Sequence, residues 1–341
     1  MTHLVVERCG PGTTLQDAGR FGWQRYGIGP AGAMDRALMA AANLLAGNAA
    51  DTAAIEFALA GGRFRVEGGA VRVALGTLDA ELKIDGRLIA PCSSATAHYG
   101  QTIDVSTLRA GMYAYLATAG GLAVPAELGA IATHVRAGLG GLGGRALRAG
   151  DRLACAAAPP EGSDLAAPAP PISEPASDPI RVMLGPQADY FDAAGLATFL
   201  GETYTVTMQV DRMGIRLAGS RIAHGAMGSN IVSDGIATGS IQVPGSGEPL
   251  VLLADRQTTG GYPKIATVIS ADLGRLAQMR PGSAIRFAAV SRTAAIAALD
   301  AQRRRLAAFA HSLRPAGADA DLSSERLLAI NLVDGWTYGP H

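Results

Sequence analysis

The sequence predicts a mainly β protein with two tandem β-rich domains and a C-terminal helix. The chain has 341 residues, 44 of them glycine, and only 5% are aromatic. So much glycine destabilises helices but suits tight turns and bulges. Short alternating segments recur without strand–helix–strand alternation, which favours barrels or sandwiches. A proline-rich stretch over residues 156–179 then separates two halves and predicts an extended linker.

The two halves share one order of landmarks: an opening strand ended by Gly-Pro, an apolar run ended by Gly-Gly, and an Arg-x-Gly turn before a closing strand. In order, these are Leu4–Gly12, Met112–Gly121 and Leu147–Cys155 in the first half, and Ile180–Pro186, Leu250–Gly261 and Met279–Val290 in the second. This repetition predicts a duplicated domain. The expected boundaries are 1–155, the linker at 156–179, 180–290, and a C-terminal helix and tail at 291–341.

Within the halves, alternating apolar residues predict strands and helical spacing predicts few helices. The expected strands are Phe64–Leu75, Ala80–Ile89 with a hairpin turn at Asp85-Gly86, and Glu202–Val210. The expected helices are Met34–Ala46, a segment within Tyr190–Leu200, and Ser291–Leu313, whose arginines we expect on a solvated face.

Composition argues against several classes of protein. The 29 basic and 29 acidic residues balance, which disfavours binding to nucleic acid or an anionic membrane. Cys9, Cys92 and Cys155 are far apart and predict neither disulfides nor a zinc site. Without an expected signal peptide or membrane span, a soluble cytoplasmic protein is the expectation.

The glycine cluster at 138–144 contains a GxGxxG pattern, but a turn and a strand follow it where a dinucleotide site needs a helix. We therefore expect a structural loop. The six histidines are scattered without metal-ligand spacing, no metal site is expected, and no hydrolytic triad is visible.

Two dense sets of polar residues beside glycines could line a ligand groove or tie loops together. The first contains Thr13, Thr14, Gln16, Asp17, Arg20, Met34, Asp35 and Asn43. The second contains Asp211, Arg212, Met213, Arg216, Ser233, Asp234, Gln242, Asp255 and the run from Arg256 through Thr258, Thr259, Gly260, Gly261 and Tyr262 to Lys264. Function and scaffold are equally compatible with most of them, whereas Asp17, Arg20 and Asp35 favour a structural role.

Several of these segments resemble the family of the 5-oxoprolinase C subunit or KipA, also called the biotin-dependent carboxyltransferase family or allophanate hydrolase subunit 2. The similar segments are TTLQDAGRFGWQRYGIGPAGAMD, ANLLAGN, ATAGGLAVP, DRMGIRLAG, SDGIATGSIQVP and DRQTTGGYPKIATVISADLGRLAQMRPG. The resemblance runs from about Gly10 to Phe287 and implies two cyclophilin-like β-barrels.

The resemblance also implies partners and a reaction. With KipI-like B and LamB/YcsF-like A subunits, the protein is expected to cleave 5-oxo-L-proline to L-glutamate with ATP, which an undetermined chain of the complex binds. One alternative is a carboxyltransferase that moves a carboxyl group from carboxybiotin on a separate carrier to urea or a related amide. Another is a KipA-type regulatory module that binds and antagonises a KipI-like kinase inhibitor.

Together, motif and resemblance assign roles. The expected catalytic residues are Asp211, Arg212, Gln242, Thr259 and Lys264. The expected substrate-binding residues are Met213, Ser233, Asp234, Thr258, Gly260, Gly261 and Tyr262. Asp17, Arg20, Met34, Asp35 and Asn43 are expected to be structural or to line a first-domain groove. Ala130 and Ala132 stand where the family has serines, so we expect the active surface mainly in the second domain.

Overall fold

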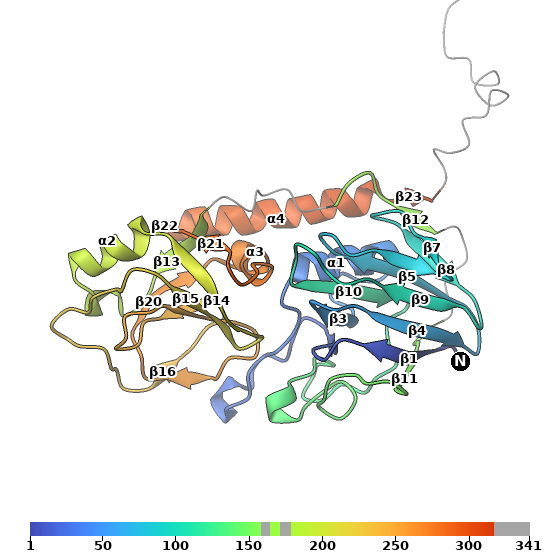
Figure 1. The fold of residues 1–341 in the computed structure, drawn as a ribbon, viewed down its shortest axis with the longest axis horizontal. Helices are drawn as coiled ribbons and strands as arrows, with labels where there is room; N and C mark the ends of the chain where they lie inside the picture. Colours follow the sequence, from blue (N-terminus) through green and yellow to red (C-terminus); the bar gives the residue numbers. More distant parts are fainter. Residues whose placement is uncertain (158–163, 171–178, 317–341) are drawn as a thin grey trace, which may run out of the picture.

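The computed structural model describes residues 1–157, 164–170 and 179–316. Over these residues the chain forms two β domains side by side, and one long helix lies across both (Figure 1). The predicted fold class of two tandem β-barrel domains with few short helices and a C-terminal helix is confirmed.

The first domain encloses its core between two antiparallel sheets. One sheet has the spatial order β11 (Arg152–Ala154), β1 (His3–Cys9), β4 (Gly62–Glu67), β9 (Thr102–Val105), β6 (Leu82–Ile84) and β7 (Arg87–Leu88). The other has the order β2 (Thr14–Gln16), β3 (Ala54–Ala58), β10 (Tyr113–Thr118), β5 (Val71–Gly76) and β8 (Ser94–Ala97).

Strand β10 is buried on both faces because successive side chains point to opposite sides of a sheet. Ala114 and Leu116 face the core between the sheets. Tyr113 and Tyr115 belong to a second core, together with apolar residues of helix α1 (Arg36–Ala46). The second core continues into the barrel of the other domain, so the two domains share one apolar cluster.

The second domain is an eight-stranded, nearly closed barrel. Its order is β21 (Ala284–Ile285), β14 (Tyr204–Val210), β15 (Gly214–Ala218), β18 (Leu250–Leu252), β17 (Ser240–Gln242), β20 (Lys264–Val268), β13 (Ile180–Leu184) and β22 (Phe287–Ala289). The two end strands are separated by Arg286 alone, which shows how closely the sheet curls back on itself. Pairing is antiparallel except between β13 and β22.

The remaining elements are short. They are α2 (Ala193–Gly201), α3 (Leu273–Ala277), the 3-10 turns η1 (Gln24–Tyr26), η2 (Val135–Ala137), η3 (Ala188–Tyr190) and η4 (Ser270–Asp272), and two small sheets that pair β16 (Asp234–Gly235) with β19 (Thr259–Gly260) and β12 (Leu165–Ala166) with β23 (Arg314–Pro315).

Helix α4 (Arg292–Ser312) bridges the domains along one side of the molecule (Figure 1). It begins at Arg292 after the N-cap Ser291, whose side chain accepts the Ala294 N–H at 3.2 Å. The helix contacts β13 and η4 of the second domain and α1 of the first. Phe309 is buried in the shared apolar cluster, while Arg303 and Arg304 are exposed as expected.

Two sequence predictions need correction. The single strand expected over Phe64–Leu75 is two strands, β4 and β5, which enter different sheets. Gly68, with φ of 81°, turns the chain between them. Within the expected linker, residues 165–166 form β12, which pairs with β23 after α4. The helix expected over Met34–Ala46 begins at Arg36 because Asp35 is its N-cap.

Candidate functional site

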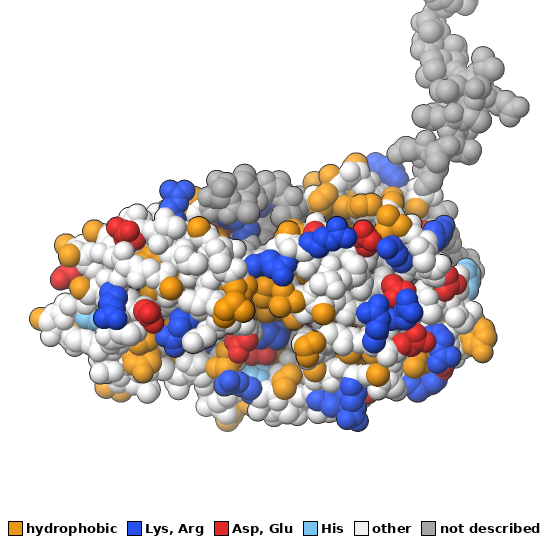
Figure 2. Space-filling view, viewed as in Figure 1, with side chains coloured by type: hydrophobic (Ala, Val, Ile, Leu, Met, Phe, Trp, Pro, Cys, Tyr) orange, Lys and Arg blue, Asp and Glu red, His pale blue; other side chains and the backbone are white. Residues whose placement is uncertain are grey.

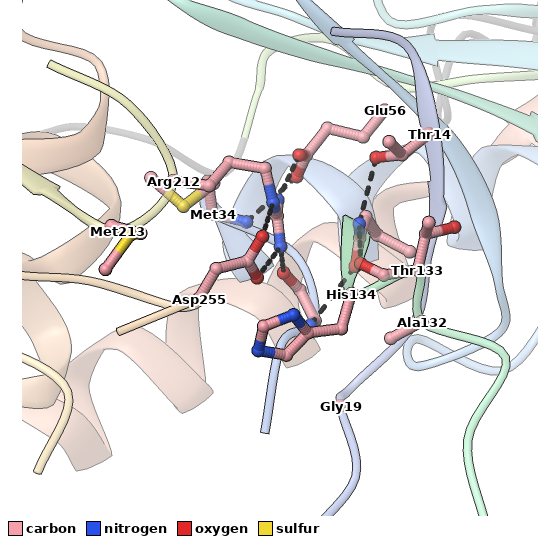
Figure 3. A network of polar contacts seen from close by, with 12 residues as sticks. Thr14, Gly19, Met34, Glu56, Ala132, Thr133, His134, Arg212, Met213 and Asp255 are labelled. Carbon is pink, nitrogen blue, oxygen red and sulfur yellow. Dashed lines mark hydrogen bonds and ion pairs between the residues drawn. The ribbon is translucent and has the colours of Figure 1, made fainter. Parts of the chain in front are cut away.

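Arg212 joins the two domains through a buried cluster of charges (Figure 3). It lies in the turn between β14 and β15. Its Nε and Nη2 donate to the two carboxylate oxygens of Asp255, both at 2.9 Å. In the first domain, Nη1 donates to Glu56 Oε1 and Nη2 to the Gly32 carbonyl at 2.8 Å. One guanidinium therefore holds a second-domain loop against two first-domain segments.

Glu56 lies on β3 and is fully buried. Its Oε2 accepts the Met34 N–H at 2.9 Å and the Tyr115 hydroxyl at 2.7 Å, and that hydroxyl in turn accepts the Asp35 N–H. Burial, followed by the charge of Glu56, raises the pKa of Tyr115 well above its ordinary value, so it remains a donor. Burial alone would lower the pKa of Arg212, but Glu56 and Asp255 outweigh it and raise that pKa. Burial raises the pKa of Glu56, while the charge of Arg212 acts to lower it, so the two groups are strongly coupled.

His134 lies beside this cluster, at the same contact between the domains. A Cβ added at Gly29 would lie 3.1 Å from His134 Nε2 and 3.0 Å from the Arg256 carbonyl oxygen, so any other residue there would press on both groups. Burial lowers the pKa of His134. We call the region formed by Gly29, Glu56, His134, Arg212 and Asp255 the domain seam.

A second polar group surrounds Lys264, the buried first residue of β20. Its ammonium donates to Asp234 Oδ2 at 2.8 Å, and Gln187 Nε2 donates to the same oxygen at 3.2 Å. The Lys264 contact holds the pKa of Asp234 below its ordinary value. Gln242 is buried and donates to the Tyr262 carbonyl at 3.4 Å. Gln242 and Lys264 are partners across β17 and β20, and Lys264 contacts Asp234 on β16, so the structure brings the three residues together.

Arg256 connects the second polar group to the seam. Its Nε and Nη2 donate to the Ile236 carbonyl at 3.1 and 3.0 Å, and Gln24 Nε2 of the first domain donates to the same oxygen. Its Nη1 is buried and has no hydrogen-bond partner among the described residues. Burial lowers the pKa of Arg256 to about 10.

Not all the expected second-domain residues belong to one site. Asp211 and Met213 line a separate surface hollow of about 370 Å³ with Gln257. The Asp211 carboxylate also accepts the N–H groups of Met213 and Gly214, which fixes its own turn. The positions around β19 are partly or fully exposed; these are Ser233, Thr258, Thr259, Gly260, Gly261 and Tyr262.

The expected first-domain residues hold the loops in place. Asp17 accepts the N–H groups of Gly19 and Ile131, and Asn43 donates to the Thr52 carbonyl. Arg20 is 1% exposed and donates to the carbonyl groups of Glu127, Ala130 and Ala132.

Asp35 caps α1, and the Met34 N–H donates to Glu56. Ala130 lines a hollow of about 360 Å³ with Asp17. Ala130 and Ala132 are buried, 3% and 0% exposed, and pack against Ala31. The glycine cluster is a loop after η2, as expected.

Sequence reasoning missed four residues of the seam and its surroundings: Glu56, Tyr115, His134 and Gln278. Gln278 Oε1 accepts the N–H groups of Met112 and Tyr113, and its Nε2 donates to Asp35 Oδ2 at 3.0 Å. The available signal was a lone carboxylate in the apolar strand AIEFA, since buried charges require partners.

The described residues contain no group of three or more His, Cys, Asp or Glu side chains that could hold a metal. Over the same ranges, no helix has the length and apolar character needed to cross a membrane. The three cysteines are unpaired.

Comparison with known proteins finds one matching family and two relatives that share one name. Residues 26–289 match the family described as carboxyltransferase domain, subdomain A and B. The chain is 38% identical to the 5-oxoprolinase C subunit of Haemophilus influenzae, over 82% of this chain and 88% of that protein. It is 36% identical to the Escherichia coli protein of the same name, over 88% of this chain and 96% of that protein.

Among solved structures, the Kluyveromyces lactis urea carboxylase superposes with a TM-score of 0.83 at 27% identity. The match covers 95% of this chain and 30% of that one. The chain therefore spans nearly all of its 5-oxoprolinase relatives but a minor part of the solved urea carboxylase.

Proposed function

We propose, on the premise that this chain belongs to the carboxyltransferase-domain family, that it is the C subunit of an ATP-dependent 5-oxoprolinase. The observation that carries the proposal is 38% and 36% identity to two 5-oxoprolinase C subunits, of which the chain spans 88% and 96%. In the proposed complex, KipI-like B and LamB/YcsF-like A subunits act with it to cleave 5-oxo-L-proline to L-glutamate.

The proposed role of this chain is to bind and polarise the lactam. Opening the ring develops negative charge on the lactam oxygen, and fixed donors lower the barrier for that step. Lys264 supplies such a donor, held by Asp234 at 2.8 Å. Buried Gln242 supports β19 from below, because a Cβ at Gly260 would lie 2.6 Å from its Nε2. We assign the lactam-binding site to Lys264, Asp234 and Gln242. In this proposal, the domain seam fixes the orientation of that site relative to the first domain.

We assign no step with ATP to this chain. A phosphate-binding glycine loop opens a helix, so that the helix N-terminus faces the phosphates. The glycine cluster at 138–144 follows a 3-10 turn and no helix begins from it. The described residues therefore offer no fit for a nucleotide at this motif.

The test is glutamate release by the purified three-subunit complex. Omitting this chain is expected to abolish release, and equal rates with and without it would contradict the proposal. Lys264→Met is expected to lower kcat by about 10²–10³-fold, the usual loss for one such donor. The only other lysine, Lys83, is on β6 away from the site, so Lys83→Met is the matched control and should retain activity.

A second candidate is a carboxyltransferase role, favoured by the superposition on urea carboxylase with a TM-score of 0.83. Arg256 fits the carboxylate of carboxybiotin, because its buried Nη1 has no partner among the described residues. Bound carboxybiotin would supply the carboxyl group.

The test combines this chain with a biotin carboxylase, a biotinylated carrier, ATP, labelled bicarbonate and urea. Labelled product that depends on this chain supports the candidate, and its absence excludes urea as acceptor.

A further inference from the structure

Two neighbouring loops of the first domain expose aromatic and apolar side chains that the proposed reaction does not use. The loop at 19–29 contains η1 and leaves Phe21 and Tyr26 each 61% exposed. The adjacent loop contains η2 and leaves Val135 50% exposed. Both turns lie together at the lower edge of the molecule in Figure 1, and Figure 2 shows blue and orange side chains mixed along this edge. We call the surface made by Phe21, Arg25, Tyr26, Arg36, Val135 and Arg136 the edge surface.

The edge surface is held in place by contacts on three sides. Trp23 Nε1 donates to the Leu128 carbonyl at 3.0 Å, which ties the first loop to the segment before η2. Gln24 Nε2 donates to the Ile236 carbonyl of the second domain, also at 3.0 Å. Gly29 lies directly against His134. Exposed aromatic rings on fixed loops lose little conformational entropy on binding, which favours recognition.

The charge of the edge surface is one-sided. The Arg25 guanidinium lies 4.8 Å above the Tyr26 ring and that of Arg36 lies 5.5 Å above Phe21. Among the residues that the structure describes, Arg25, Arg36 and Arg136 form no salt bridge. Two carboxylates lie near this surface: Asp17, whose charge acts on Arg36 and which accepts the Gly19 and Ile131 N–H groups, and Glu127, which accepts that of Gly140.

We propose that an acidic, partly apolar face of a partner protein docks on the edge surface. Tyrosine, phenylalanine and arginine are enriched at the centres of protein interfaces, and unpaired arginines attract a complementary acidic face. The loops also contact the seam region, through Gly29 against His134 and Gln24 donating to the Ile236 carbonyl, so a partner bound there would lie beside the domain seam. The inference rests on the proposed function for the identity of this partner, the KipI-like protein of the complex.

The test measures the affinity of the full chain for the purified KipI-like protein, which is independent of turnover. The double variant Arg25→Glu/Arg136→Glu is expected to raise Kd by about 100-fold, and Tyr26→Ala by about 30-fold, in line with the loss of interface hot spots. Added salt should weaken wild-type binding more than that of the charge-reversed variant, because exposed charges are screened.

Matched controls use exposed residues far from the edge surface. Arg304→Glu on α4 and Tyr99→Ala in the turn between β8 and β9 should leave Kd unchanged. Wild-type chain that does not bind the KipI-like protein, or edge variants that bind as tightly as wild type, would overturn the proposal. The proposal would also be overturned if the wild-type chain sedimented with anionic phosphatidylserine vesicles and did not bind the KipI-like protein. Edge-dependent binding without glutamate release would instead contradict the proposed function and leave this inference intact.

Discussion

Arg212 pairs with one buried carboxylate in each domain, and its removal leaves both carboxylates without this partner. Glu56 is 0% and Asp255 7% exposed. We expect Arg212→Met to lower the free energy of unfolding by about 3–5 kcal/mol, since breaking a buried pair leaves its partner charges uncompensated. Urea denaturation followed by circular dichroism measures the change.

A double-mutant cycle separates the pair from its surroundings. Glu56→Gln in the Arg212→Met background removes one of the stranded charges. The loss in the double variant should therefore be smaller than the sum of the two single losses, by about 0.5–3 kcal/mol. Additive losses would show that the contact with Glu56 contributes no coupling.

His134 predicts a pH dependence of stability. Burial lowers its pKa, so the unfolded chain binds a proton more readily than the folded one. Its contribution is complete above the unfolded pKa of about 6.5 and is lost as pH falls from there to the lowered folded pKa. His134→Asn should flatten the decline in unfolding free energy between about pH 7 and about pH 5. An unchanged slope in the His134→Asn variant would contradict this role of His134.

At the same scale, the sequence predicted the polar residues but not how they group. Lys264, Asp234 and Gln242 were expected in one site and lie together. Arg212 was expected in that site but belongs to the seam, because its partner Glu56 lies 156 positions away on a strand of the other domain. Sequence spacing carries no information about such a contact.

Among the elements, α4 buries one side chain in the core, while partly buried residues such as Gln302, which donates to the Ala271 carbonyl, add further contacts. Phe309 is its buried residue, 4% exposed, whereas Ile296 on the same helix is 50% exposed. Phe309→Ala is expected to lower the free energy of unfolding by about 3–5 kcal/mol through a cavity in the shared cluster. Ile296→Ala should cost less than about 1 kcal/mol, since little of its apolar surface is buried. Similar losses for both would contradict the role of Phe309 as an anchor.

Elements with local signals were predicted well. The end of α1 at Gly47 follows from a left-handed cap, with φ of 88°, that glycine adopts without strain. The hairpin at Asp85-Gly86 joins β6 to β7 as expected. The run Phe64–Leu75 was predicted as one strand because apolar residues alternate within each of its halves. Only the structure shows that the chain passes from one sheet to the other at Gly68.

For the whole molecule, the shared apolar cluster predicts that both domains unfold together. Gln278 adds four hydrogen bonds across their contact, to Met112, Tyr113 and Asp35. Wild-type chain should show one calorimetric transition with equal calorimetric and van't Hoff enthalpies. Gln278→Ala leaves those buried groups unpaired and should lower Tm. Two separate transitions in the wild type would contradict the coupling.

The overall arrangement could be predicted only in outline. The proline-rich stretch and the repeated landmarks predicted two β domains, and these are present. That the domains share a core could not be predicted, because the apolar faces of α1 and β10 have the same composition whichever surface they cover. Helix α4 was predicted as a helix with a solvated face, while its position across both domains depends on contacts that no local pattern specifies.

The pairing of β12 with β23 has a consequence for the order of folding. It joins Leu165 to Pro315 and Ala166 to Arg314, so it closes a chain loop that contains the whole second barrel and α4. The entropy lost on closing a loop grows with its length, and two residues per strand return little energy until the ends are already near each other. The barrel and α4 must therefore form first. This small sheet is therefore expected to form last during folding and to be lost first during unfolding.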